Sequence, residues 1–101
     1  MVSIALIAAS SKSGVLIAKE AKARGFKVTG FVRDASKVSK DNLDNVVVRD
    51  AFKITAEDLA GFDVVISAYA PPMDNLELLK DQVQVLVNAL SGTQTRLYVV
   101  G

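Results

Sequence analysis

Apolar and polar segments alternate along the chain in the order expected of strands and helices. Five short runs are rich in Val, Ile and Leu, side chains that favour buried strands. Most positions within these runs are apolar, as in parallel sheets whose two faces are both covered. The runs that predict strands are residues 2–7, 27–32, 46–48, 63–67 and 97–100.

Two long helical patterns lie between the predicted strands. Residues 14–24 combine an apolar face with Lys, Glu and Arg on the other side. Gly25 follows at a position where a left-handed backbone conformation commonly ends a helix. Residues 74–90 form the longest pattern, in which Leu and Val recur at the spacing of one buried stripe. Asp74 is placed to cap the start of this second helix.

Two shorter helical segments are expected as well: one turn within residues 34–40, and a helix capped by Thr55. Strands and helices then alternate throughout, which is typical of an α/β fold with a parallel sheet. Right-handed crossovers give the strand order 3-2-1-4-5. We therefore expect residues 1–101 to form a single Rossmann-like domain, in which a five-stranded sheet lies between two layers of helices.

The composition excludes several functional classes. The formal net charge is +1 and no block of basic residues occurs, so nothing indicates binding to nucleic acid. The chain has no Cys and no His. This removes disulfides, thiolate chemistry, His-dependent catalytic triads and the commonest metal ligand. We therefore expect a cytoplasmic location and no bound metal. We also expect no membrane span, since no apolar run approaches the roughly 20 residues that a span needs.

The chain after the first predicted strand has the layout of a dinucleotide-binding turn, but two of its three expected glycines are replaced. In such a turn the first glycine allows a tight bend, the second lets the backbone approach the pyrophosphate, and the third lets the helix pack closely. These positions hold Ala8, Ser11 and Gly14. Alanine at the first position is a small change if the local φ is negative. The serine at the second is a larger one, because its side chain points to the expected phosphate position.

Two interpretations of this turn stay open. In the first, the hydroxyls of Ser10, Ser11 and Ser13 donate hydrogen bonds to phosphate oxygens. Lys12 and the positive end of the helix then attract the negative charge. In the second, Ser10 or Ser11 only caps the helix, and Gly14 only allows close packing.

Residues at the ends of the next three strands belong to the same edge of the predicted sheet. Arg33 follows the second strand, where an arginine can accept a 2′-phosphate, so NADP(H) is favoured over NAD(H). The alternative is a solvated Arg33 beside an Asp34 that caps the next turn. Asp50 follows the third strand and either accepts a hydrogen bond from an adenine amino group or caps its own loop. After the fourth strand, Ala68 leaves room for a cofactor. Tyr69 either stacks on the cofactor or donates a hydrogen bond to it, or else it only covers the core.

Several of these segments together resemble a known family. The chain is similar to the atypical short-chain dehydrogenase/reductases, and within them to the NADH-flavin reductase and biliverdin reductase B-like group, which is related to NmrA-like regulators. The resemblance covers essentially all of the chain and keeps the order of the motifs. The segments that carry it are IALIAASSKSG (4–14), GFKVT (25–29), FVRD (31–34), RDAF (49–52) and DVVISAY (63–69).

The resemblance implies an NAD(P)H-binding domain that passes hydride to a flavin or a similar small acceptor. Members of the family continue past the fifth strand into a loop that lines the nicotinamide and then into a substrate-binding half. The Tyr-x-x-x-Lys pair of typical short-chain dehydrogenases would also lie there, so no catalytic residue is assigned within residues 1–101. The cofactor-binding positions of the family correspond to Ala8, Ser10, Ser11, Lys12, Ser13, Arg33, Asp50, Ala68 and Tyr69.

Two functions are therefore expected. The first is the cofactor-binding half of an NAD(P)H-dependent oxidoreductase, which Arg33 and Asp50 favour. The second is a non-catalytic Rossmann domain, either a nucleotide sensor or a fold that no longer binds a cofactor, which Ser11 favours. The fifth strand is predicted to form an uncovered edge of the sheet. Exposed strand edges and apolar patches commonly bind other chains, so we expect a homo-oligomer, most simply a twofold dimer.

Overall fold

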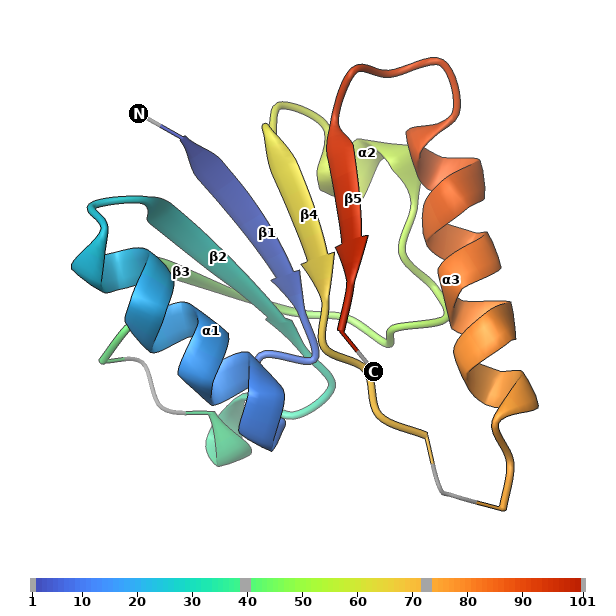
Figure 1. The fold of residues 1–101 in the computed structure, drawn as a ribbon, viewed down its shortest axis with the longest axis horizontal. Helices are drawn as coiled ribbons and strands as arrows, with labels where there is room; N and C mark the ends of the chain where they lie inside the picture. Colours follow the sequence, from blue (N-terminus) through green and yellow to red (C-terminus); the bar gives the residue numbers. More distant parts are fainter. Residues whose placement is uncertain (1, 39–40, 72–73, 101) are drawn as a thin grey trace.

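The chain folds into a parallel sheet with helices on both faces (Figure 1). The computed structural model describes residues 2–38, 41–71 and 74–100. The strand order is β3-β2-β1-β4-β5, and each neighbouring pair is parallel. The predicted α/β class and strand order are thus confirmed. The elements are β1 Ser3–Ile7, α1 Lys12–Ala23, β2 Lys27–Val32, the 3-10 turn η1 Ala35–Lys37, β3 Asn45–Val48, α2 Ala56–Leu59, β4 Val64–Ser67, α3 Glu77–Leu90 and β5 Arg96–Val99.

Strand β1 lies at the centre of the sheet and is covered on both faces. Ala5 is paired with Thr29 of β2 and with Val65 of β4. Side chains alternate between the two faces of a strand, so β1 contributes to two cores. The core on the α1 side contains Ile4, Leu6, Ala9, Ala18, Ala21, Val28, Val32 and Ala68. The core on the side of α2 and α3 contains Ala5, Ile7, Phe31, Ile54, Leu59, Val65, Leu86 and Ala89.

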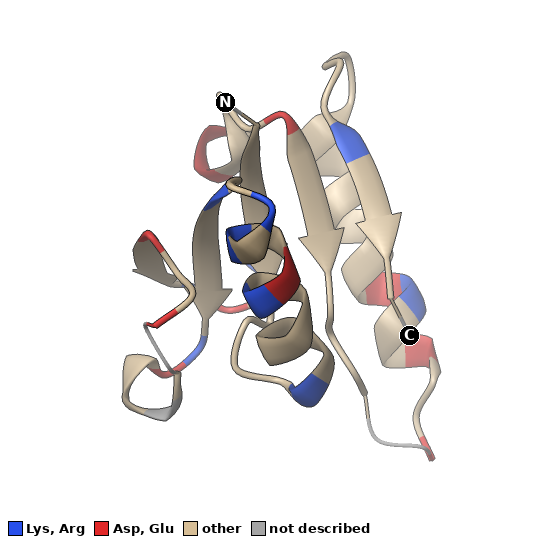
Figure 2. Ribbon diagram, turned by 60° about the vertical axis from the view of Figure 1, so that its left-hand side comes forward, with Lys and Arg blue, Asp and Glu red and all other residues tan. Residues whose placement is uncertain are grey.

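The charges are spread over helices and loops (Figure 2). Within the strands the only charged residues are Lys27 and Arg96, and each is the first residue of its strand. The other end of the sheet is formed by the carboxyl ends of the strands, to which all five strands point in Figure 1. The charged residues at this end lie in the loops that follow the strands. Within the described residues, no helix is both long enough and apolar enough to span a membrane.

Most of the local predictions are confirmed. Gly25 has a φ of +80° after α1, as expected for a helix end. Thr55 and Asp58 form a capping box at the start of α2. Asp34 accepts a hydrogen bond from the Ser36 N–H and caps η1. In each case the residue that begins or ends the helix is a short polar side chain or a glycine, and both can be recognised in the sequence.

The start of α3 differs from its prediction. The helix begins at Glu77, and the residue before it, Leu76, has no side-chain capping bond. Backbone bonds close the first turn instead, from the Leu78 N–H to the Asn75 carbonyl (3.3 Å) and from the Leu79 N–H to the Leu76 carbonyl (3.1 Å). The prediction that Asp74 caps this helix is therefore wrong. The neighbouring Pro72 and Met73 lie outside the described residues.

Candidate functional site

The turn after β1 has a glycine-like conformation without a glycine. Ala8 has a φ of +61°, whereas the alanine was expected to be a small change only for a negative φ. The left-handed conformation costs a non-glycine residue roughly 1–2 kcal/mol. The N–H groups of Ala8 and Ala9 both lie near the Phe31 carbonyl, at N···O distances of 3.0 and 3.4 Å. These two bonds hold the strained turn against the end of β2.

Ser11 has a structural role that settles part of the open interpretation. Its Oγ accepts a hydrogen bond from the Gly14 N–H (3.0 Å) and so caps α1. The same hydroxyl donates to the Ala68 carbonyl at the end of β4 (3.1 Å). The capping interpretation is confirmed for this serine. Its hydroxyl also joins the first turn to the segment after β4.

Gly14 lies in the first turn of α1, where the helix passes very close to the turn before it. A Cβ atom added here would lie 2.4 Å from the Ala8 carbonyl oxygen and 3.0 Å from the Ala9 Cα. Both of these are backbone atoms, which have little room to move. The expectation that this glycine allows close packing is confirmed, and α1 can point its amino end at the site.

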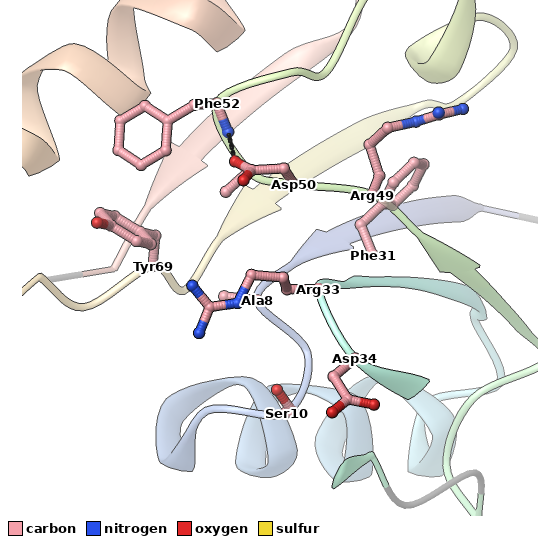
Figure 3. A pocket seen from close by; sticks show the side chains of 10 residues that line it. Ala8, Ser10, Phe31, Arg33, Asp34, Arg49, Asp50, Phe52 and Tyr69 are labelled. Atoms are coloured by element: carbon pink, nitrogen blue, oxygen red, sulfur yellow. Dashed lines mark hydrogen bonds between the residues drawn. The ribbon is translucent and has the colours of Figure 1, made fainter. Parts of the chain in front are cut away.

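A pocket of about 350 Å³ lies at the carboxyl ends of β1, β2, β3 and β4. Figure 3 shows the side chains that converge on it. Five of the nine residues expected to bind a cofactor line it, namely Ala8, Ser10, Arg33, Asp50 and Tyr69. The other four, Ser11, Lys12, Ser13 and Ala68, do not line it. The pocket is lined in addition by Phe31, Asp34, Arg49, Ala51 and Phe52.

Two arginines line the pocket in different ways. Arg33 extends from the end of β2 with its guanidinium on the Tyr69 side, whereas Arg49 extends in the opposite direction (Figure 3). Arg49 Nη2 lies 2.9 Å from Asp58 Oδ1. Arg33 has no such ion pair within the described part of the chain. Its positive charge is therefore the more available to a ligand.

Asp58 is held in its ionised form by the same contacts. Desolvation by burial raises its pKa, but hydrogen bonds from Thr55 and Arg49 outweigh this effect and set the pKa below the ordinary value of 3.8. The Thr55 N–H donates at 2.9 Å and the Thr55 hydroxyl at 3.2 Å, both to Asp58 Oδ2. Arg49 is consequently tied to the start of α2.

Asp50 shapes the loop after β3. Its Oδ1 accepts a hydrogen bond from the Phe52 N–H at 2.8 Å, so the loop-capping interpretation is confirmed. A second bond, from the Lys53 N–H to the Asp50 carbonyl (2.9 Å), tightens the same turn. A carboxylate has about four acceptor sites on its two oxygens, so this bond leaves capacity for a ligand.

An aromatic pair borders the pocket. The rings of Phe52 and Tyr69 meet edge to face, with centroids 5.4 Å apart and planes at 86° (Figure 3). Phe52 comes from the loop after β3 and Tyr69 from the segment after β4. Phe52 was not among the predicted site residues. Its position two residues after Asp50 could have indicated it, because an aspartate in a loop commonly accepts a hydrogen bond from the backbone N–H two residues later.

Comparison with known proteins shows the family to which the chain belongs. A sequence model described as NAD(P)H-binding matches residues 8–101. The chain belongs to the NAD(P)H-binding family. The domain is 42% identical over 101 residues to the uncharacterised protein YwnB of Bacillus subtilis, covering 97% of this chain and 46% of that protein.

Two solved structures show how closely the NAD(P)H-binding domain follows known relatives. A provisionally assigned NADH-flavin reductase from Streptococcus pneumoniae is 38% identical, with a TM-score of 0.89, over 100% of this chain and 47% of that one. A Listeria monocytogenes protein is 38% identical, with a TM-score of 0.84, over 97% of this chain and 58% of that one. The chain thus spans about half the length of the relatives it matches. The predicted family resemblance is confirmed.

Proposed function

We propose that the pocket at the carboxyl edge binds the adenosine half of a nicotinamide dinucleotide. The observation that carries this proposal is the position of the pocket. Strand order reverses beside β1, since β2 lies on one side of it and β4 on the other. In open α/β sheets, ligands bind outside the carboxyl ends of the strands at such a switch point. The pocket volume of about 350 Å³ is within the range of small-molecule sites.

The residues at the pocket suit the parts of such a nucleotide. Ser10 and the amino end of α1 would face the pyrophosphate, since free N–H groups and the helix dipole favour anions. Arg33 would bind the 2′-phosphate of NADP(H), and one carboxylate oxygen of Asp50 would accept a hydrogen bond from the adenine amino group. Tyr69 offers a ring face or edge for the adenine or its ribose.

Preference for NADP(H) is a finer proposal that rests on Arg33. The same pocket also contains Asp34, and an acidic residue at this position can bind the 2′-hydroxyl of NAD(H). Asp34 Oδ1 already accepts two hydrogen bonds, from the Ser36 N–H at 3.0 Å and from the Ser36 hydroxyl at 2.7 Å, whereas Asp50 accepts one from its own turn. The arginine, by contrast, extends over the pocket. NADP(H) is therefore the favoured cofactor.

Titration of the purified chain with NADPH and NADH tests both proposals, with Arg33→Met as the decisive variant. A hydrogen-bonded ion pair contributes about 1.5–3 kcal/mol, so Arg33→Met should weaken NADPH binding about 10- to 150-fold. NADH affinity should change little. Arg24→Met is the matched control, because Arg24 lies at the far end of α1 and does not line the pocket. Absence of saturable binding of either nucleotide at millimolar concentration would refute the cofactor proposal. Equal loss of both nucleotides in Arg33→Met would refute the NADP(H) preference.

Transfer of hydride to a flavin-like acceptor is a further part of this proposal. The support is the family resemblance and the solved relative from Streptococcus pneumoniae, which is 38% identical. In that reaction the cofactor supplies the hydride, and the domain holds and orients it. NADPH oxidation in the presence of FMN tests the proposal. Tight binding without any turnover would favour the alternative, a non-catalytic nucleotide sensor.

We further propose that the chain forms a twofold homodimer. Among the described strands, β5 pairs only with β4 and is one edge of the sheet. Its side chains Tyr98 and Val99 are 50% and 42% exposed. An apolar strand edge with unpaired backbone groups is a template for pairing with another chain. Light scattering at micromolar concentration should give the mass of a dimer, and a monomer mass would contradict this proposal.

A further inference from the structure

A buried amide joins the two segments that border the pocket. Gln82 lies on α3 with its side chain fully buried, at 0% exposure. Its Oε1 accepts a hydrogen bond from the hydroxyl of Ser67, the last residue of β4 (3.0 Å). Its Nε2 donates to the carbonyl of Ala51, in the loop after β3 (3.2 Å). A carbonyl can only accept, so the NH₂ group must face Ala51 and the orientation of the amide is fixed.

The two partners of Gln82 come from distant parts of the sheet. β3 and β4 are separated by β2 and β1 in the strand order, so no ladder of strand hydrogen bonds joins their ends directly. The loop that contains Ala51 also presents Asp50 and Phe52 to the pocket. The segment after Ser67 presents Tyr69. Gln82 therefore joins, from within the core, the same two segments that the Phe52–Tyr69 contact joins at the pocket.

The type of residue at this position is informative. Gln82 lies on the buried side of α3, four residues before the fully buried Leu86. A polar side chain taken out of water is unfavourable unless its polar atoms have hydrogen-bond partners, and an apolar residue would be the simpler choice here. Among the described residues, no buried side-chain nitrogen or oxygen lacks a partner. The two bonds of Gln82 add a directional constraint that apolar packing does not supply.

We propose that Gln82 is a positioning residue for the nucleotide pocket, because its amide anchors the loop of residues 50–52 to α3 through the bond to the Ala51 carbonyl. It touches no ligand itself. Its effect is to hold Asp50 and Phe52 at the spacing from Tyr69 that the adenosine end of a dinucleotide requires. The part of this inference that concerns the ligand rests on the proposed function, whereas the part that concerns the loop does not.

The test compares Gln82→Met with Ser67→Ala. Methionine has a similar length but loses the donor to Ala51. Ser67→Ala disturbs the same buried network and leaves the Gln82–Ala51 bond in place. Loss of one hydrogen bond corresponds to roughly a two- to tenfold change in an equilibrium constant. We expect Gln82→Met to raise the NADPH dissociation constant by about this factor and to speed amide exchange at Phe52 and Lys53, two amides of this loop.

The two variants separate positioning from general stability. Both should lower the midpoint of urea unfolding, but Ser67→Ala should keep the NADPH affinity within about twofold and the loop exchange near that of the unaltered chain. Equal loss of affinity and equal loop exchange in the two variants would overturn the proposal. If the unaltered chain binds neither NADPH nor NADH, the proposed function fails. The exchange rates of Phe52 and Lys53 then decide the role of Gln82 without it.

A measurement on the unaltered chain covers the case in which Gln82→Met does not fold. The side-chain NH₂ signals of Gln82 should exchange slowly with solvent, and they should shift when NADPH saturates the pocket. Rapid exchange of these hydrogens would contradict a fixed amide. Unchanged signals, while the backbone signals of Asp50 and Phe52 shift, would contradict coupling between the amide and the pocket.

Discussion

Removal of the Ser11 hydroxyl tests the structural account of the turn most sharply. Ser11→Ala deletes the cap on α1 and the bond to the Ala68 carbonyl, which are 3.0 and 3.1 Å long. Loss of a helix cap costs about 0.5–2 kcal/mol, and loss of a second, partly buried hydrogen bond costs about 0.5–1.5 kcal/mol. We therefore expect the free energy of unfolding to fall by about 1–3.5 kcal/mol. At about 4–8 °C per kcal/mol for a domain of this size, the melting temperature falls by roughly 4–28 °C.

Two matched variants make this prediction specific. Ser11→Thr keeps a hydroxyl that can cap, so it should lose much less stability than Ser11→Ala. Ser13 lies in the first turn of α1, and Ser13→Ala should change the free energy of unfolding by no more than about 0.5 kcal/mol. The assay is urea and thermal unfolding followed by circular dichroism at matched protein concentration. If Ser11→Ala is no less stable than Ser13→Ala, the two bonds assigned to Ser11 do not contribute as argued.

The remaining predictions concern Ala8 and Asp58. Ala8→Gly relieves the positive φ of +61° and should stabilise the fold by about 0.5–1 kcal/mol after the extra backbone entropy of glycine is subtracted; a lower melting temperature would contradict the strained turn. Asp58 has a pKa below 3.8 in the folded chain, so the stability that its ionised form contributes is present above that value and is lost as the pH falls through its folded pKa. Urea midpoints from pH 7 to pH 3 should therefore decline less steeply for Asp58→Asn than for the unaltered chain, and parallel declines would exclude this contribution.

The framework of the fold was predictable because its determinants are local and periodic. Runs of β-branched residues, the stripe of residues 74–90 and the glycine at position 25 each act within their own segment. The right-handed crossover rule then leaves few arrangements of the five strands. Asp74 misled the prediction because a capping residue is effective only where the helix begins, and backbone bonds close the first turn of α3 at Glu77 instead.

The sequence predicted which site residues lie at the strand ends, but it predicted the directions of their side chains less well. Arg33, Asp50 and Tyr69 follow strands whose carboxyl ends meet at one edge, so their convergence followed from topology. The positive φ of Ala8 could not be predicted, because alanine is not a residue type that indicates a left-handed conformation. The sequence could have indicated Gln82, since it is a polar residue on the apolar face of α3. Its partners, however, come from 15 and 31 residues away.

The most direct test of the central claim is a map of the backbone amide signals that shift when the chain is titrated with NADPH. We expect saturable shifts that cluster at the carboxyl ends of the strands. They should appear in the turn of residues 8–14, at Arg33, in the loop of residues 50–52 and at Tyr69. The opposite edge, near Lys27 and Arg96, should be unaffected. Shifts confined to that opposite edge, or no saturable shift at millimolar NADPH or NADH, would contradict the account.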